Sequence, residues 1–238
     1  MQDYQRKFTD FLVESGAFKL GQFTLKSGRV SPTFVNTGLV EDGRTLAHLG
    51  DAYAAKLLDA LGAGGFDSVF GPAYKGVPLA VATAISLAQK GAVKPYLFDR
   101  KEKKTHGEEA SGKTDAASVL VGHRPNEGER IAMVDDVLTD GATKREAVAL
   151  LKSIVPGARF PALVIAVNRQ ETLPDGNDAC TSFTSSCGVP VFAAVTMTEI
   201  LTHLEETGRL PAEMKSKCVA YLDQYGTAEA KGWAAKRR

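Results

Sequence analysis

The sequence from Arg130 to Leu151, RIAMVDDVLTDGATKREAVALL, decides the fold. It opens with a short apolar run, Ile131 to Val134, of the kind that forms a strand buried on both faces. Two carboxylates, Asp135 and Asp136, follow where that strand should end. A turn rich in threonine and glycine spans 139–143, and beyond it apolar residues recur at helical spacing. The stretch therefore predicts a buried strand, an acidic pair, a turn and a helix.

The composition of the turn suits a small anion. A helix start offers free backbone N–H groups and the positive end of the helix dipole. Gly141 permits a close backbone approach, while Thr139 and Thr143 add hydroxyl donors that suit a phosphate. The acidic pair suits ribose hydroxyls or waters around a magnesium ion. The spacings G-x-x-x-x-G-K-[ST] and G-x-G-x-x-G are both absent, which excludes the common nucleotide loops. The plainer alternative is an ordinary helix capped by Asp140.

Composition indicates an ordinary globular protein of one domain, residues 1–238. Hydrophobic residues make up 44% and charged residues 24%, and the net charge is +1. We expect no nucleic-acid partner and no membrane partner, because no basic excess and no apolar run of about 20 residues occurs. The three cysteines have no C-x-x-C spacing and the first residues are polar. Both features favour a cytoplasmic protein with reduced thiols and no signal peptide.

The N-terminal part predicts a helix that ends at Gly16, followed by a hairpin. Phe23 and Leu25 alternate with polar residues before a Ser-Gly turn, which is typical of a hairpin. This segment fits a small cap over the main domain better than a strand of a parallel sheet. Taken alone, Lys26 and Arg29 are most simply surface charges.

The middle of the chain predicts alternating helices and strands, with helices over 42–61 and 77–89 and strands over 66–70 and 95–98. The loop 71–76 follows a strand, and the carboxyl ends of strands are where open α/β sheets bind ligands. Lys75 at the start of a helix opposes the helix dipole, so a ligand partner is favoured over a bystander charge.

A charge cluster from Arg100 to Glu109 leads into the polar stretch 110–117. Its position after a strand favours a mobile lid, and the alternative is a solvated basic loop. Further strands are predicted over 160–167 and 188–196, with helices over 200–204 and 214–225 and a frayed basic tail over 228–238. Arg169 is expected either to pair with Glu171 or to bind a ligand.

Five separated segments resemble, in the same order, the signature segments of the orotate phosphoribosyltransferase family, which belongs to the type I phosphoribosyltransferases. They are TLKSGRVSPTFVNTG (24–38), FGPAYKGVPLA (70–80), RKEKKTHGE (100–108), VDDVLTDGAT (134–143) and RQE (169–171). Two departures occur. Asp140 replaces a small residue of the family's phosphate loop, and extra residues, 111–130, follow the lid. His123 and Arg124 lie in that insertion and are expected to be exposed.

The resemblance implies the α/β type I phosphoribosyltransferase fold. In that fold a central, mostly parallel sheet is flanked by helices, with an N-terminal hood (about 1–40) and a flexible catalytic loop (100–118). The implied activity is Mg²⁺-dependent transfer of the 5-phosphoribosyl group from phosphoribosyl diphosphate (PRPP) to orotate, giving orotidine 5′-monophosphate and pyrophosphate in pyrimidine (UMP) biosynthesis. The implied assembly is a homodimer whose catalytic loop reaches the neighbouring active site. The alternatives are a phosphoribosyltransferase acting on a purine or uracil, and a non-catalytic PRPP-sensing regulator.

The resemblance also assigns roles to residues. PRPP contacts are implied for Lys26, Tyr74, Lys75, Arg100, Lys101, Lys104, His106, Asp135, Asp136, Val137, Leu138, Thr139, Asp140, Gly141, Ala142 and Thr143. Orotate contacts are implied for Lys26, Phe34, Val35, Thr139 and Arg169. Catalytic roles are implied for Lys101, Lys104, His106, Asp135 and Asp136. Mg²⁺ is expected to be held mainly by PRPP oxygens and waters, with Asp135 and Asp136 as its candidate protein ligands.

Overall fold

A computed structural model describes residues 1–25, 27–100, 119–138 and 141–238. Within these residues the central sheet has the strand order β5–β4–β3–β6–β7–β8. The bounds are β3 Ser68–Gly71, β4 Tyr96–Asp99, β5 Leu120–Gly122, β6 Ile131–Asp135, β7 Leu163–Asn168 and β8 Val191–Thr196. All pairings are parallel except that of the edge strand β5 with β4. The predicted mostly parallel sheet is confirmed.

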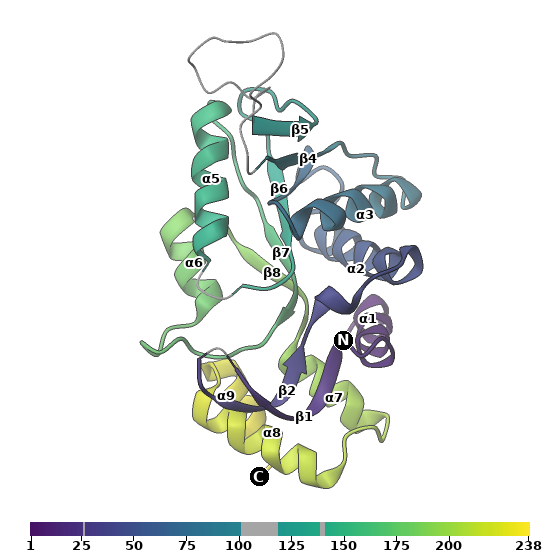
Figure 1. The fold of residues 1–238 in the computed structure, drawn as a ribbon, viewed down its shortest axis with the longest axis vertical. Helices are drawn as coiled ribbons and strands as arrows, with labels where there is room; N and C mark the ends of the chain where they lie inside the picture. Colours follow the sequence, from purple (N-terminus) through teal and green to yellow (C-terminus); the bar gives the residue numbers. More distant parts are fainter. Residues whose placement is uncertain (26, 101–118, 139–140) are drawn as a thin grey trace.

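Helices cover both faces of this sheet (Figure 1). α5 and α6 lie on one side, and α1, α2 and α3 lie on the other, while α7, α8 and α9 gather at the end next to the chain termini. The bounds are α1 Asp3–Glu14, α2 Gly43–Leu61, α3 Gly76–Gln89, α5 Ala142–Ile154, α6 Ala179–Cys187, α7 Met197–Glu206, α8 Ala212–Tyr225 and α9 Ala228–Ala235.

The core is divided between the two faces by the two-residue period of the strands. In β6, Ala132 and Val134 face the cluster that includes α1, α2 and α3, whereas Ile131 and Met133 face the cluster under α5 and α6. Every residue of β6 is buried, which explains why this strand appears in the sequence as a continuous apolar run.

The N-terminal hairpin forms its own two-stranded sheet from β1 (Phe18–Thr24) and β2 (Val30–Val35). Gly28 in the connecting turn has φ +80°, a conformation that favours glycine. The hairpin lies beside α8, away from the central sheet (Figure 1). The prediction of a hairpin outside the parallel sheet is confirmed. The short 3₁₀ helix η1 (Thr37–Leu39) then leads toward α2.

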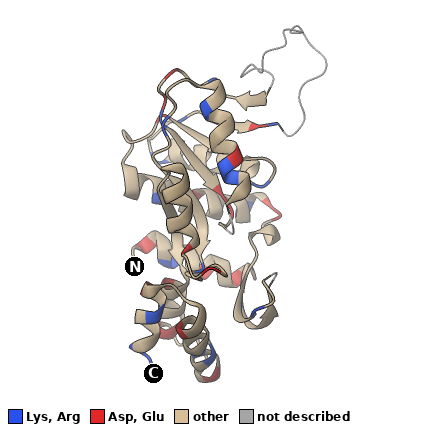
Figure 2. Cartoon of the chain, turned by 90° about the vertical axis from the view of Figure 1, so that its left-hand side faces the viewer, with Lys and Arg blue, Asp and Glu red and all other residues tan. Residues whose placement is uncertain are grey.

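The C-terminal segment corrects one expectation. Residues 228–235 form α9, in which Ala230 and Ala234 are fully buried. Arg237 lies over the Trp233 ring, 4.3 Å from its centroid, and its Nε donates to Glu205 at 2.8 Å. The predicted frayed tail is therefore wrong, because small apolar side chains spaced four apart pack the last helix onto the domain. Figure 2 shows basic and acidic residues interspersed on the helices next to the C-terminus.

The insertion also differs from expectation. It contributes β5, and its His123 is half-buried, with Nε2 3.0 Å from Glu129 Oε1. Glu129 is buried and accepts a second hydrogen bond, from Ser68 Oγ at 2.6 Å. The expected exposure of His123 is wrong, because this buried carboxylate holds the imidazole, whereas Arg124 is exposed as expected.

Candidate functional site

The strand order changes direction between β3 and β6, since β4 lies on the far side of β3 and β7 on the far side of β6. The loops that leave these two neighbouring strands diverge, which opens a crevice at their carboxyl ends. β3 leads to the loop with Tyr74 and Lys75, and β6 ends at Asp135 and Asp136. Two of the segments singled out in the sequence therefore meet at the switch point of the sheet.

The loop between β3 and α3 is held by a close contact between two glycines. A Cβ atom on Gly71 would lie 1.9 Å from the carbonyl oxygen of Gly76, so only glycine fits there. The backbone N–H of Ala73 donates to Asp99 Oδ1 at 2.6 Å. After the cis peptide bond between Ala73 and Tyr74, the Tyr74 side chain is 73% exposed. The loop thus presents Tyr74 to solvent, next to Lys75.

Each carboxylate of the acidic pair contacts a lysine. Lys75 Nζ lies 2.6 Å from Asp136 Oδ2, and Lys144 Nζ lies 2.5 Å from Asp135 Oδ2. Burial raises the pKa of the Asp135 carboxyl, although Lys144 acts in the opposite direction. The hydrogen bond to Asp136 raises the pKa of Lys75, so this lysine is held in its charged form. The switch point therefore carries two neighbouring carboxylate–lysine ion pairs.

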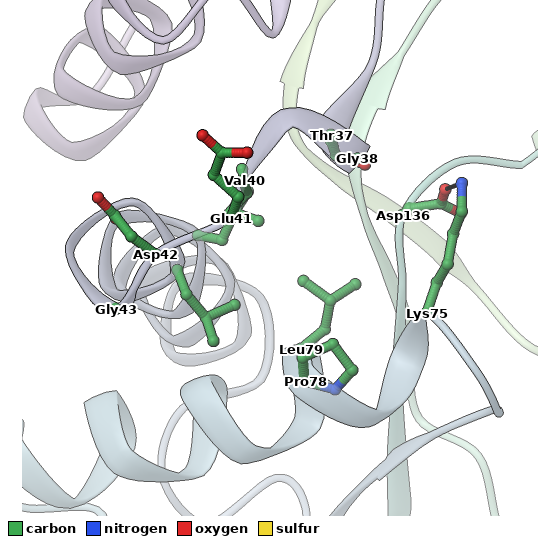
Figure 3. A pocket seen from close by; sticks show the side chains of 12 residues that line it. Thr37, Gly38, Val40, Glu41, Asp42, Gly43, Lys75, Pro78, Leu79 and Asp136 are labelled. Atoms are coloured by element: carbon green, nitrogen blue, oxygen red, sulfur yellow. Dashed lines mark hydrogen bonds and ion pairs between the residues drawn. The ribbon is translucent and has the colours of Figure 1, made fainter.

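A cavity of about 380 Å³ adjoins the ion pair of Lys75 and Asp136 (Figure 3). Its walls come from η1, the start of α2 and the start of α3, with apolar side chains such as Leu46 and Leu79. In Figure 3, Lys75 and Asp136 point toward each other along one side of this space. Glu41 and Asp42 line the side away from Lys75 and Asp136, so charged and apolar side chains both border this space.

The structure describes the turn after β6 up to Leu138 and again from Gly141. Gly141 has φ +74° and precedes the first residue of α5, and a Cβ atom there would lie 2.8 Å from Phe183 Cδ2. Ala142 and Thr143, in the first turn of α5, are exposed, whereas Val137 and Leu138 are half-buried. The positive end of the α5 dipole at this turn is consistent with the predicted anion site.

The hairpin and the loop after β7 lie close together. Arg29 Nη1 donates to the carbonyl oxygen of Thr172 at 2.7 Å, and its guanidinium lies 4.7 Å from the centroid of the Tyr225 ring. On this side Arg169 pairs with Glu171 at 2.5 Å, the plainer of its two expected roles. Phe34 stacks on Phe23 with centroids 5.2 Å apart and remains partly exposed.

The half-buried Val35 ends β2 in this same hairpin, while Arg100 is exposed at the end of β4. Expectations for six residues lie outside the described part of the chain: Lys26, Lys101, Lys104, His106, Thr139 and Asp140.

Three residues of this region carry roles that the sequence pattern did not assign. Lys144 is buried against Asp135, Tyr53 donates from its hydroxyl to the carbonyl oxygen of Asp135 at 2.7 Å, and Arg29 joins the hairpin to the loop after β7. Lys144 gave a usable signal, since a lysine in the first turn of a helix opposes the dipole and needs a partner. The other two contacts join distant segments and have no local signal.

Comparison with known proteins identifies the family. Residues 37–200 match the model of the phosphoribosyl transferase domain. Over 92% of its length the chain is 41% identical to the orotate phosphoribosyltransferase of Bifidobacterium adolescentis and covers 96% of that protein. The chain belongs to the orotate phosphoribosyltransferase family. The family member of Vibrio atlanticus is 42% identical, over 95% of this chain and 100% of that protein.

A solved orotate phosphoribosyltransferase has the same architecture. The Francisella tularensis structure superimposes with a TM-score of 0.78 at 33% identity, covering 93% of this chain and 100% of that one. The expected family and fold are confirmed. Among the described helices of this orotate phosphoribosyltransferase family member, none is long and apolar enough to span a membrane.

Proposed function

We propose that the chain transfers the 5-phosphoribosyl group from PRPP to orotate, giving orotidine 5′-monophosphate and pyrophosphate, in pyrimidine (UMP) biosynthesis. One observation carries this proposal. In a member of the orotate phosphoribosyltransferase family, Lys75 and the acidic pair converge at the switch point of the sheet. The turn that begins α5 would take the 5′-phosphate, and the acidic pair would take the ribose hydroxyls.

The reaction needs no nucleophile from the protein. The bond between C1 and the diphosphate oxygen breaks, with its electron pair leaving on pyrophosphate. The pyrimidine nitrogen then attacks the oxocarbenium-like centre from the opposite face, as in glycoside chemistry, and its N–H proton is released. Catalysis is therefore positioning together with stabilisation of the departing charge. Lys75 would exchange Asp136 for a diphosphate oxygen. The resemblance adds Arg100, Lys101, Lys104 and His106, with Lys104 and His106 as candidate proton donors.

The acidic pair fits Mg²⁺ bound together with PRPP. Among the described residues no group of three or more histidine, cysteine or acidic side chains could hold a metal alone. Mg²⁺ keeps several waters and is usually held by one or two carboxylates plus substrate phosphates, which matches two adjacent aspartates. The acidic pair would supply its protein ligands, with Asp136, which lines the cavity, as the nearer of the two to the ligand space. When bound, the ion would neutralise charge on the diphosphate oxygens.

The base site would lie between the hairpin and the loop after β7. The planar guanidinium of Arg169 suits a flat heterocycle that bears a carboxylate, because it donates two parallel hydrogen bonds. Its present partner is a carboxylate of Glu171, so orotate would replace one carboxylate by another. Phe34, Val35 and Lys26 of the hairpin would complete this side.

We also propose a homodimer in which each catalytic loop serves the neighbouring subunit. Large apolar side chains are exposed around α3, at Tyr74, Ile85, Val93 and Tyr96, with Val93 80% exposed. An apolar surface of this kind supports burial against a second copy. Sedimentation velocity tests the assembly, and a monomer at micromolar concentration would contradict it.

The three free cysteines support a cytoplasmic location.

The test of function is a three-base assay. Purified protein is mixed with Mg²⁺, PRPP and either orotate, adenine or uracil, and orotate absorbance and pyrophosphate release are followed. The proposal predicts turnover with orotate only. Turnover with adenine or uracil would favour another phosphoribosyltransferase activity, and PRPP binding without turnover would favour the regulator.

A further inference from the structure

The two aspartates at the end of β6 are held in different ways. Both oxygens of Asp135 face protein groups: Oδ2 contacts Lys144 Nζ at 2.5 Å, and Oδ1 accepts a hydrogen bond from the backbone N–H of Asp136 at 2.8 Å. The side chains of Asp135 and Lys144 are only 8% and 10% exposed. Asp136 has equivalent partners, because its Oδ1 accepts from the backbone N–H of Val137 at 2.7 Å and its Oδ2 contacts Lys75. The two carboxylates therefore differ in the exposure of their lysine partners.

Asp136 is also buried, with 12% of its side chain exposed, but its lysine partner is not. Its Oδ2 contacts Lys75 Nζ at 2.6 Å, and the Lys75 side chain is 68% exposed. Lys75 and Asp136 both line the cavity beside η1 (Figure 3). Asp135 and Lys144 do not line this cavity. An ion pair with one exposed partner is held weakly, because water screens the charges. Asp136 can therefore exchange its lysine for a ligand more readily than Asp135 can.

The Asp135–Lys144 pair is costly to break. Removing one member of a buried ion pair leaves an uncompensated charge, which is far less favourable than removing both members. Lys144 also lies in the first turn of α5, where the helix dipole opposes a cation, so it depends on Asp135. The pair joins the end of β6 to the start of α5, on the two sides of the turn that would hold the phosphate.

We propose that the two aspartates have unequal roles: Asp136 makes the direct contact with the sugar of PRPP, while Asp135 and Lys144 are positioning residues that fix the turn between β6 and α5. This inference rests on the proposed function and divides the acidic pair within it. Its chemistry is that of one cavity-lining carboxylate that exchanges its lysine for a sugar diol, with a second carboxylate committed to the scaffold.

The test compares Asp136→Asn with the set Asp135→Asn, Lys144→Met, Lys144→Arg and the double variant D135N/K144M. Wild-type turnover with PRPP and orotate is measured first and decides the proposed function by itself. Melting temperature, PRPP binding and the KM for PRPP are then measured for each variant. D136N should have the melting temperature of the wild type. Its kcat/KM for PRPP should be about 100-fold lower, which is the effect expected from the loss of one contact to the transition state.

The remaining variants should behave as a coupled unit. D135N and K144M should each melt below the wild type. The neutral pair in D135N/K144M should melt above both single variants and regain about tenfold or more of the kcat/KM lost by D135N, equivalent to about 1.4 kcal/mol. K144R, which keeps the charge, should retain more activity than K144M.

Three results would overturn the proposal. One is a double variant that recovers its melting temperature but stays as inactive as D135N, since Asp135 would then contact the substrate itself. Another is a double variant that melts no higher than either single variant. The third, which does not depend on how the pair variants fold, is D136N with the PRPP affinity of the wild type.

Discussion

Replacing Gly71 by alanine tests how the site is positioned, because this glycine meets Gly76 across the loop that carries Lys75. The added Cβ would lie 1.9 Å from the Gly76 carbonyl oxygen and 2.4 Å from its carbonyl carbon. Both obstructing atoms belong to the backbone, so no side chain can rotate away to relieve the contact. Either the end of β3 or the start of α3 has to move.

The magnitude follows from that contact. Overpacking a well-packed site typically costs about 1–3 kcal/mol, and an obstructing backbone places this variant at about 3 kcal/mol. For a chain of this size, each kcal/mol lowers the melting temperature by about 2–4 °C, which gives a fall of about 6–12 °C. Because Lys75 precedes α3 directly, movement of this helix should also raise the KM for PRPP more than the KM for orotate.

The assay is thermal melting followed by initial rates measured well below the transition. Gly232→Ala is the matched control: it lies inside α9, no atom lies within 4 Å of its added Cβ, and alanine in a helix is favoured by about 0.5–1 kcal/mol. The G232A variant should melt at or slightly above the wild-type temperature. A G71A variant that melts within about 2 °C of the wild type and keeps its KM for PRPP would refute this reasoning.

Three further outcomes are expected. Arg169→Ala should raise the KM for orotate by about tenfold, the value of one interaction of about 1.4 kcal/mol, with little change for PRPP; equal losses for both substrates would contradict its role at the base. Lys104→Ala should lower turnover far more than it weakens PRPP binding, and unchanged turnover would remove Lys104 from the chemistry. The Arg130 guanidinium lowers the pKa of Asp67 from 3.8 to about 2. A carboxyl whose pKa is lowered by folding stabilises the protein at pH values above its ordinary pKa. This stabilisation is lost as the pH falls through the lowered pKa. The difference in melting temperature between the wild type and Asp67→Asn should therefore shrink from pH 4 to pH 2. That difference should be worth less than about 1 kcal/mol, because the pair is exposed, and a pH-independent difference would exclude this pair as its source.

The sequence predicts those parts of the fold that have a local pattern. β6 appears as a continuous apolar run because both of its faces are covered, and α5 appears through the spacing of Ala147, Val148 and Leu151. The hairpin is visible through alternation around a turn. β5 was not predicted, since a strand of three residues is defined by its pairing with β4 and not by its own composition.

The site was predicted to a similar extent. Lys75 and the acidic pair were singled out by position after a strand, and the structure brings them together. The contacts of Arg29 with Thr172 and Tyr225 join segments far apart in the chain, so no local pattern could indicate them. α9 was missed for a related reason, because Ala230 and Ala234 are small residues whose burial depends on what packs against them.

The central claim is that phosphoribosyl transfer to orotate takes place at the crevice between β3 and β6. Its most direct test is the rate of orotidine 5′-monophosphate formation by Lys75→Ala, with Lys7→Ala, an exposed lysine paired with Asp3 on α1, as the control. We predict that K75A loses about 100-fold in kcat/KM for PRPP at an unchanged melting temperature, while K7A keeps the wild-type rate. Formation of orotidine 5′-monophosphate by K75A at the wild-type rate would contradict the claim.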